Sequence, residues 1–242
     1  MKSEYSKCHI PGAIFMSVFD ETEFTDIYPR NIPKLETFEE IAREAGINSN
    51  DHVVLYSNSD INGFLVSGRA LLVFKLYGHK NISILNGGLK KWMSVGYPTT
   101  DIVPTRKRGN FKASFDAGTI AKFEDVEAIA NSQSIQICDS RASSKFSGQS
   151  SSGHIVKAVN IPLSSLMSED GELKNEKEIK EDFRKAGVDL SKPMVTYCNS
   201  GMSSCSLAII GSLCGCPQSR VYLGGFTEWS KRAPSNLIEK TE

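Results

Sequence analysis

The chain has 242 residues, of which 40% are hydrophobic and 23% charged, as in an ordinary globular protein. Its 28 basic residues balance 28 acidic ones and form no basic stripe, so nothing in the charge favours nucleic acid as a partner. No run approaches the roughly 18 consecutive apolar residues of a membrane span, and residues 2–7 lack the apolar core of a signal peptide. The length allows one large domain or two of ordinary size.

The first half of the chain alternates helix and strand signals. We expect a helix, a strand, a helix and a strand, in this order, over residues 37–45, 52–56, 64–76 and 82–85. Only eight residues precede His9, so we expect this half to be shortened at its N-terminus and to lack an opening strand. Such a loss would leave a sheet edge or a core face uncovered. Residues 98–119 are polar and are expected to form a linker.

The second half carries the same alternation with more elements. Strands are expected over residues 135–138, 193–197 and 220–223, and helices over residues 176–186 and 204–213. Gly187 and Pro217 end the two helices, and Gly224-Gly225 turns the chain into a short helix around Trp229. Alternation of this kind predicts an α/β fold with a mostly parallel sheet that is flanked by helices on both faces.

Three ordered motif matches relate the two halves. His9-Ile-Pro-Gly-Ala13 matches His154-Ile-Val-Lys-Ala158, the run around Tyr56-Ser-Asn-Ser59 matches Tyr197-Cys-Asn-Ser200, and Gly87-Gly-Leu-Lys-Lys-Trp92 matches Gly224-Gly-Phe-Thr-Glu-Trp229. The matched His, Tyr and Trp residues lie 145, 141 and 137 residues apart, a separation that drifts as loop lengths change. We therefore predict a duplication, with one domain at residues 1–97, a linker at 98–119 and a second domain at 120–242.

The polar loop after the strand at 193–197 carries the most reactive residue that we predict. Cys198 lies between a buried strand and a helix, and ligands of open α/β sheets bind at the carboxyl ends of strands. The positive end of the following helix and the inward-pointing amides of a tight loop both favour a thiolate, which is the nucleophile. Gly201 permits the backbone conformation of the loop, and Ser200, Ser203 and Ser204 can donate to the sulfur or its cargo. The alternative is a buried structural cysteine, as we expect for Cys138 and Cys205.

Two other cysteine enzymes are disfavoured by residue spacing. Tyrosine-type phosphatases need an Arg six residues after the nucleophile to hold phosphate in a bidentate fork, and that position is Ser204. The Cys-Gly-Ser-Cys-Trp motif of papain-like proteases does not occur. Six cysteines without the spacing of a disulfide framework indicate a reducing compartment. Cys214-Gly-Cys216 lacks the further ligands that a zinc site requires.

Along nearly its whole length the chain resembles tandem rhodanese-type sulfurtransferases. The motifs that carry the resemblance are His9-Ile-Pro-Gly-Ala13, Asn86-Gly-Gly with Trp92, Cys138-Asp-Ser-Arg141, Ser152-Gly-His154, Val159-Asn-Ile-Pro162, the Cys198 loop and Gly224-Gly-Phe with Trp229. The resemblance implies that the first copy is inactive, with Ser57 in the place of Cys198. In this family Cys-Arg-Lys-Gly marks thiosulfate-using members and Cys-Gly-Ser-Gly marks mercaptopyruvate sulfurtransferases. Cys198-Asn-Ser-Gly201 resembles the second loop.

The resemblance also implies a mechanism without metal or organic cofactor. Cys198 would take sulfur from 3-mercaptopyruvate or thiosulfate as a persulfide and pass it to a thioredoxin-like thiol, glutathione or cyanide. The loop residues Asn199, Gly201, Met202 and Ser203 would bind the substrate with their backbone amides, and Ser200 would assist Cys198. Members of the family occur in the cytoplasm and in mitochondria.

Some positions depart from the family pattern. A donor-binding Arg of the family is matched by Lys145, which keeps the charge but loses the planar fork. A further donor-binding Arg has no match in the short loop at residues 147–152. His9 matches a His that the mercaptopyruvate branch pairs with the loop serine and an upstream Asp, and that Asp would precede Met1. Asp139, Arg141 and His154 fit structural roles.

Two functions follow from these residues. Cys198 and its loop favour an active sulfurtransferase that prefers 3-mercaptopyruvate. Lys145, the short loop and the shortened first copy favour the alternative, a catalytically weak persulfide carrier or binding protein of the same fold. Turnover with a sulfur donor separates the two, because a carrier accepts sulfur without multiple turnover.

Overall fold

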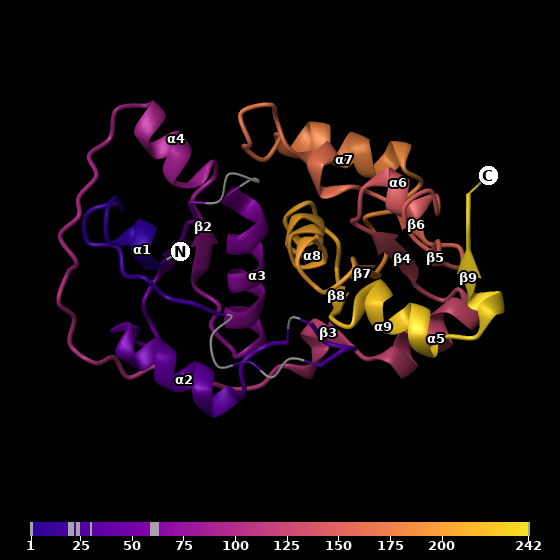
Figure 1. Cartoon of the computed structure of the whole chain (residues 1–242), viewed down its shortest axis with the longest axis horizontal. Coiled ribbons are helices and arrows are strands. Elements are labelled where there is room, and N and C mark those ends of the chain that lie inside the picture. The colour runs from indigo at the N-terminus through magenta and orange to yellow at the C-terminus, as the bar shows by residue number, and fades with distance from the viewer. Residues whose placement is uncertain (1, 19–21, 23–24, 30, 59–62, 242) are drawn as a thin grey trace. The chain divides into compact units, whose positions relative to one another are not determined.

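The computed structural model describes residues 2–18, 22, 25–29, 31–58 and 63–241 of the chain (Figure 1). It divides into two compact units. The first comprises Met1–Glu23, Ile32–Asp116 and Asp170–Glu172, and the second comprises Phe24–Asn31, Ala117–Glu169 and Leu173–Glu242. Thus Phe24–Asn31, from the first half of the sequence, belongs to the second unit, and Asp170–Glu172, from the second half, belongs to the first unit. The domain boundaries expected at residues 97 and 120 stay predictions.

The first unit is built around a parallel strand pair. Its elements are α1 (Lys2–Tyr5), α2 (Leu35–Glu44), β1 (Val53–Leu55), α3 (Gly63–Leu76), β2 (Ile82–Ile84) and α4 (Gly88–Ser94). The register sets Val53 opposite Ile82. Both predicted helices and both predicted strands of this half are therefore confirmed. Phe111 lies in the segment expected as a linker, yet its buried ring meets those of Phe38 and Phe74 in the core of this unit.

The second unit contains a five-stranded sheet. Its elements are η1 (Ala117–Thr119), β3 (Ile120–Ala121), α5 (Phe123–Ser132), β4 (Gln136–Asp139), α6 (Ser143–Phe146), β5 (His154–Ile155), β6 (Val159–Asn160), η2 (Leu163–Leu166), α7 (Glu176–Lys185), β7 (Met194–Tyr197), α8 (Ser203–Leu213), β8 (Ser219–Tyr222), α9 (Gly225–Arg232), η3 (Ser235–Leu237) and β9 (Ile238–Glu239). The strand order is β3-β8-β7-β4-β6, and every neighbouring pair is parallel. The predicted parallel α/β fold is confirmed.

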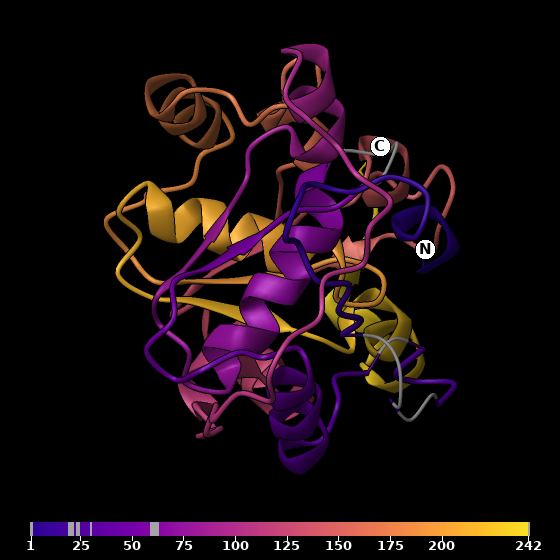
Figure 2. The ribbon, with the colours of Figure 1, turned by 90° about the vertical axis from the view of Figure 1, so that its left-hand side faces the viewer.

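Alternation along the central strand β7 assigns the two faces of this sheet. Val195 and Tyr197 point into a core that contains residues of α5 and α9, including Trp229. Thr196 points to the opposite face, where its hydroxyl donates to the carbonyl of Ser204 on α8 at 2.8 Å. Figures 1 and 2 show α8 on one side of these strands and α9 on the other. Buried strands covered on both faces explain why β7 is continuously apolar or β-branched.

No helix in the described part of the chain is both long and apolar enough to cross a membrane.

One turn of the repeated motif has a strained backbone conformation in the second unit but not in the first. Among the described residues, two that are not glycine have positive φ angles, Lys157 and Gln133, both at 56°. The motif match aligns Lys157 with Gly12, whose φ is 82°. A side chain in this region crowds its own backbone, whereas glycine adopts it readily. The second unit therefore carries strain at a turn where the first does not.

Replacing this residue should stabilise the second unit. Lys157→Gly is expected to raise the free energy of unfolding by about 0.5–1 kcal/mol, because relief of the left-handed strain exceeds the entropy cost of glycine. Chemical denaturation measures the change. Lys177→Gly, at an exposed position of helix α7, is the matched control and should lower stability, because glycine is a poor helix former. Equal destabilisation by both substitutions would contradict the assignment of strain.

Candidate active site

The carboxyl ends of three neighbouring strands meet at one edge of the sheet in the second unit. The register aligns Asp139 of β4 with Tyr197 of β7, and Tyr197 with Tyr222 of β8. The residues that follow these strands, among them Cys198 and Gly224, therefore lie at the same edge. This is the edge at which open parallel α/β sheets bind their ligands.

The loop after β7 encloses the sulfur of Cys198. The residue is 4% exposed. Its Sγ accepts a hydrogen bond from the Met202 amide at 3.2 Å and another from the Ser204 hydroxyl at 3.5 Å. Gly201 closes the loop with a φ of 73°, and its carbonyl accepts from the buried Cys205 thiol at 2.8 Å. The chain thus turns back on itself so that donors converge on one atom.

These donors determine the ionisation of the sulfur. Burial by itself raises the pKa of Cys198, because the thiolate loses water. The side chain and amide of Ser204, the amide of Ser200 and the hydroxyl of Ser203 act in the opposite direction and outweigh burial, so the pKa lies below its ordinary value. Helix α8 begins at Ser203 and directs its positive end toward the same loop. The loop therefore favours the thiolate, which is the nucleophilic form.

Helix α9 fixes the loop from the neighbouring strand. The amide of Phe226 donates to the carbonyl of Cys198 at 2.7 Å, and that of Thr227 donates to the carbonyl of Asn199 at 3.1 Å. Gly225 permits this approach, because a Cβ at that position would lie 2.3 Å from the Cys198 carbonyl oxygen. The Gly-Gly motif is thus explained by close packing against the reactive loop.

The first unit contains the same arrangement around Ser57. The amide of Leu89 donates to the Ser57 carbonyl at 3.2 Å, and a Cβ on Gly88 would lie 2.6 Å from the same oxygen. The Ser57 hydroxyl donates to the carbonyl of Gly63 at 2.8 Å. Ser57 therefore occupies the position in its unit that Cys198 occupies in the second. Ser59, the match of Ser200, lies outside the described residues.

The end of β4 supports the reactive loop through two contacts. The Ser140 and Ser203 hydroxyls are 2.8 Å apart, and the Ser140 amide donates to the carbonyl of Tyr197 at 2.9 Å. Sequence reasoning did not single out Ser140, Gly225 or Phe226 as site residues. All three nevertheless lie in motifs that carry the resemblance, Cys138-Asp-Ser-Arg141 and Gly224-Gly-Phe226, at the ends of strands that neighbour β7.

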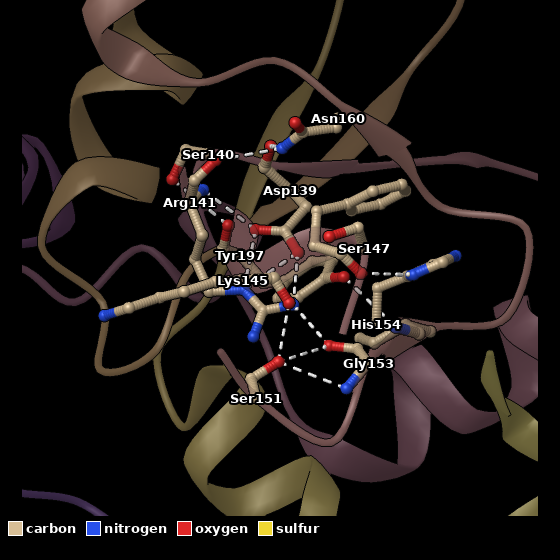
Figure 3. Close-up of polar contacts among 12 residues, drawn as sticks. Asp139, Ser140, Arg141, Lys145, Ser147, Ser151, Gly153, His154, Asn160 and Tyr197 are labelled. Carbon is tan, nitrogen blue, oxygen red and sulfur yellow. Dashed lines mark hydrogen bonds and ion pairs between the residues drawn. The ribbon is translucent and has the colours of Figure 1, made fainter. Parts of the chain in front are cut away.

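Asp139 and Arg141 form a buried ion pair beside the loop (Figure 3). The guanidinium reaches the Asp139 carboxylate at 2.6 Å and donates to the carbonyl of Gly153 at 2.8 Å. It also lies 4.2 Å from the ring centre of Phe226 and 5.6 Å from that of Tyr197. Arg141 thus joins β4, the loop before β5 and helix α9. These contacts fit the structural role expected from the sequence.

Lys145 projects from the short helix α6. Its side chain is half-buried, and Figure 3 shows it extending away from the Asp139–Arg141 pair. Within the residues that the structure describes, its ammonium makes no hydrogen bond or ion pair. The charge is therefore available for an anion, and its use in donor binding stays a prediction.

The two histidines of the repeated motif make matching contacts in their own units. The buried ring of His9 stacks on Tyr5, and its Nδ1 and Nε2 lie 2.7 and 3.1 Å from the carbonyl oxygens of Tyr5 and Ile102. The ring of His154 stacks on Phe146 at 3.7 Å, with Nδ1 2.8 Å from the Phe146 carbonyl oxygen. These are contacts of structural residues. A substrate contact of His9 stays a prediction.

A duplicated α/β domain with an activated cysteine at its ligand-binding edge defines a class of enzymes that use a thiolate nucleophile. The sequence profile of the rhodanese-like domain matches residues 1–95 and 122–232. The chain is 34% identical to the thiosulfate sulfurtransferase of Gallus gallus, over 96% of this chain and 82% of that protein. It is also 34% identical to the 3-mercaptopyruvate sulfurtransferase of Homo sapiens, over 99% of this chain and 83% of that protein.

A solved structure agrees with these relatives. The crystal structure of SseA from Escherichia coli, a 3-mercaptopyruvate sulfotransferase with the rhodanese fold, matches with a TM-score of 0.84 at 29% identity, over 93% of this chain and 85% of that chain. Tum1 from Saccharomyces cerevisiae shares the fold with a TM-score of 0.86 at 22% identity, over 99% and 86% of the two chains. The protein belongs to the rhodanese-like family, and it is a sulfurtransferase.

Removing one donor to the sulfur should weaken the thiolate. Ser204→Ala is expected to move the alkylation of Cys198 by iodoacetamide to higher pH and to slow it about tenfold at neutral pH, because a hydrogen bond to the charged sulfur is lost. Rates measured between pH 5 and 10 test this. Ser212→Ala, farther along α8, is the control and should leave the profile unchanged, since its hydroxyl donates to the Ala208 carbonyl. An unshifted profile for Ser204→Ala would show that the hydroxyl does not stabilise the thiolate.

Proposed function

We propose that this sulfurtransferase transfers sulfur from 3-mercaptopyruvate, and less readily from thiosulfate, through a persulfide on Cys198. The observation that carries the proposal is the convergence of the Met202 amide and the Ser204 hydroxyl on the Cys198 sulfur, with a lowered pKa despite burial. A thiolate prepared in this way attacks electrophilic sulfur, and the same donors would hold the persulfide anion that results.

The first step forms one bond and breaks another. The Cys198 thiolate attacks the donor sulfur, the new S–S bond forms, and the C–S bond of 3-mercaptopyruvate breaks with its electron pair on carbon. The resulting enolate takes up the thiol proton and leaves as pyruvate. With thiosulfate, the S–S bond of the donor breaks instead and sulfite leaves. In both cases Cys198 retains one sulfur atom.

The second step returns the enzyme to its starting form. A thiolate of glutathione or of a thioredoxin-like protein, or cyanide, attacks the outer sulfur of the persulfide, and Cys198 leaves as the stabilised thiolate. The lowered pKa of Cys198 favours this step, because a weaker base is a better leaving group. The loop therefore serves both steps with the same hydrogen-bond donors.

Binding of the donor is assigned to Lys145 and the loop. The free ammonium of Lys145 would attract the carboxylate of 3-mercaptopyruvate or the sulfonate of thiosulfate. Asn199, Gly201, Met202 and Ser203 would contribute backbone amides, and Ser200 would act on the donor beside Cys198. Preference for 3-mercaptopyruvate is supported by Ser200 in the Cys-x-Ser-Gly loop. The relatives do not decide between donors, because thiosulfate and 3-mercaptopyruvate sulfurtransferases are equally similar.

The proposed site of action is a reducing compartment, the cytoplasm or the mitochondrion. All six cysteines are unpaired in the structure. Persulfide chemistry requires a free thiol and thiol acceptors, and both persist under reducing conditions. The absence of disulfide cross-links therefore supports this location.

Steady-state release of pyruvate from 3-mercaptopyruvate with a dithiol acceptor tests the function, with thiosulfate in parallel. We expect turnover that prefers 3-mercaptopyruvate and is lost in Cys198→Ser. Faster turnover with thiosulfate would overturn the donor assignment. One stoichiometric sulfur on Cys198 without turnover would favour the persulfide carrier instead.

Substitution of Lys145 tests donor binding separately. Lys145→Ala should raise the KM for both anionic donors about tenfold or more, because the attracting charge is lost. Lys145→Arg should lower KM, since a guanidinium can hold a carboxylate through two parallel hydrogen bonds. Unchanged KM values in both variants would remove Lys145 from the donor site.

A further inference from the structure

We propose that the C-terminal strand and the loop before β5 form a clamp that positions Lys145, and that Ser151 and Gly153 are positioning residues for donor binding. The C-terminal clamp comprises residues 237–241 and the loop at residues 147–153. The inference rests on the proposed role of Lys145 and adds to it the elements that hold this lysine in place.

Main-chain hydrogen bonds attach the C-terminal segment, residues 237–241, to strand β5 and to the start of the loop at Ser147. Strand β9 pairs antiparallel with β5, with Ile238 opposite Ile155. On one side the amide of Val156 donates to the carbonyl of Leu237 at 3.0 Å, and on the other the amide of Thr241 donates to the carbonyl of Ser147 at 3.2 Å. Main-chain hydrogen bonds therefore fix the segment against the loop independently of side-chain chemistry.

Gly153 is the point of closest approach between the two parts. Its φ is 121°, and a Cβ at this position would lie 2.0 Å from the carbonyl oxygen of Glu239. The aliphatic part of Lys240 covers the loop nearby, since a Cβ on Gly148 would lie 3.0 Å from its Cγ. The contact has no room for a side chain, so any residue other than glycine must move β9 away from the loop.

Ser151 links the loop to the main chain of Lys145 through a hydrogen bond (Figure 3). Its hydroxyl donates to the carbonyl of Lys145 at 2.6 Å and accepts from the amide of Gly153 at 3.1 Å. The amide of Ser150 also donates to the carbonyl of Ser144 at 3.0 Å. The main chain of α6 is thus fixed to a loop that β9 holds from the other side.

This support matters because the residue is a lysine. A lysine side chain is flexible and makes no planar fork, so its charge is well placed only if its backbone is fixed. An interaction with an anion gains affinity when less freedom is lost on binding. The clamp reduces that loss at the backbone, while the ammonium stays free for the donor.

Ser151 provides the first test. Ser151→Ala should raise the KM for 3-mercaptopyruvate about five- to tenfold and leave kcat nearly unchanged, as loss of one hydrogen bond would. Ser151→Thr retains the hydroxyl and should restore KM. Ser212→Ala is the matched control, because its hydroxyl also donates to a carbonyl, that of Ala208, but lies in α8 outside the clamp. The Cys198 alkylation profile should be the same in all three variants.

Gly153 provides the second test. Gly153→Ala should raise the KM by pushing β9 from the loop. Gly215→Ala imposes similar backbone strain, with a φ of 103°, but its Cβ would meet nothing within 4 Å, so its KM should match the wild type. Thermal unfolding of each variant separates this effect from a general loss of folding.

A double substitution separates the two proposals. If the clamp acts through Lys145, adding Ser151→Ala to Lys145→Ala should raise KM no further. If Lys145→Ala raises KM while Ser151→Ala and Gly153→Ala leave it unchanged, the clamp is overturned and the donor role of Lys145 stands. If Lys145→Ala itself has no effect, both proposals fail.

Discussion

The reactive loop depends on the close contact between helix α9 and the end of strand β7. The Phe226 amide donates to the Cys198 carbonyl, and Gly225 leaves room for this approach. While the Cys198 carbonyl accepts from α9, the sulfur accepts from the Met202 amide of its own loop. A nucleophile stabilised by backbone donors requires such a rigid frame, because mobile dipoles would reorient at an energetic cost during the reaction. The parallel register of β7 and β8 is what brings the two segments together.

Duplication has kept this frame and changed its chemistry. Both units place a glycine-rich helix start against the residue after the central strand, and both hold a motif histidine against an aromatic ring and a backbone carbonyl. The residue at the centre of this frame is serine in one unit and cysteine in the other. The frame is therefore a property of the fold, whereas the proposed catalysis depends on Cys198 and the serines around it.

Sequence reasoning found most of the local features and missed the long-range ones. Buried strands, helices ended by Gly187 or Pro217 and the Cys198 loop all follow from neighbouring residues, and the structure has them in place. The pairing of β9 with β5 was not foreseen, because two-residue strands leave no periodic pattern. The membership of Phe24–Asn31 in the second unit was not foreseen either. A single sequence does not show which distant segments lie together in space. Helix α5 was also missed, although it has the apolar spacing of an amphipathic helix.

Cys198 combines a sulfur whose pKa is lowered with a position that is almost fully buried. At 4% exposure, Cys198 offers little surface to a bulky reagent and is less hindered toward a slender one. Large maleimide or fluorophore probes would therefore underreport this cysteine in surveys of reactive thiols, even though its loop lowers the pKa of the sulfur. The same enclosure would shield the proposed persulfide from chance encounters with large thiol proteins. Delivery of sulfur would then be limited to small acceptors and to proteins whose thiol stands on a narrow, protruding tip.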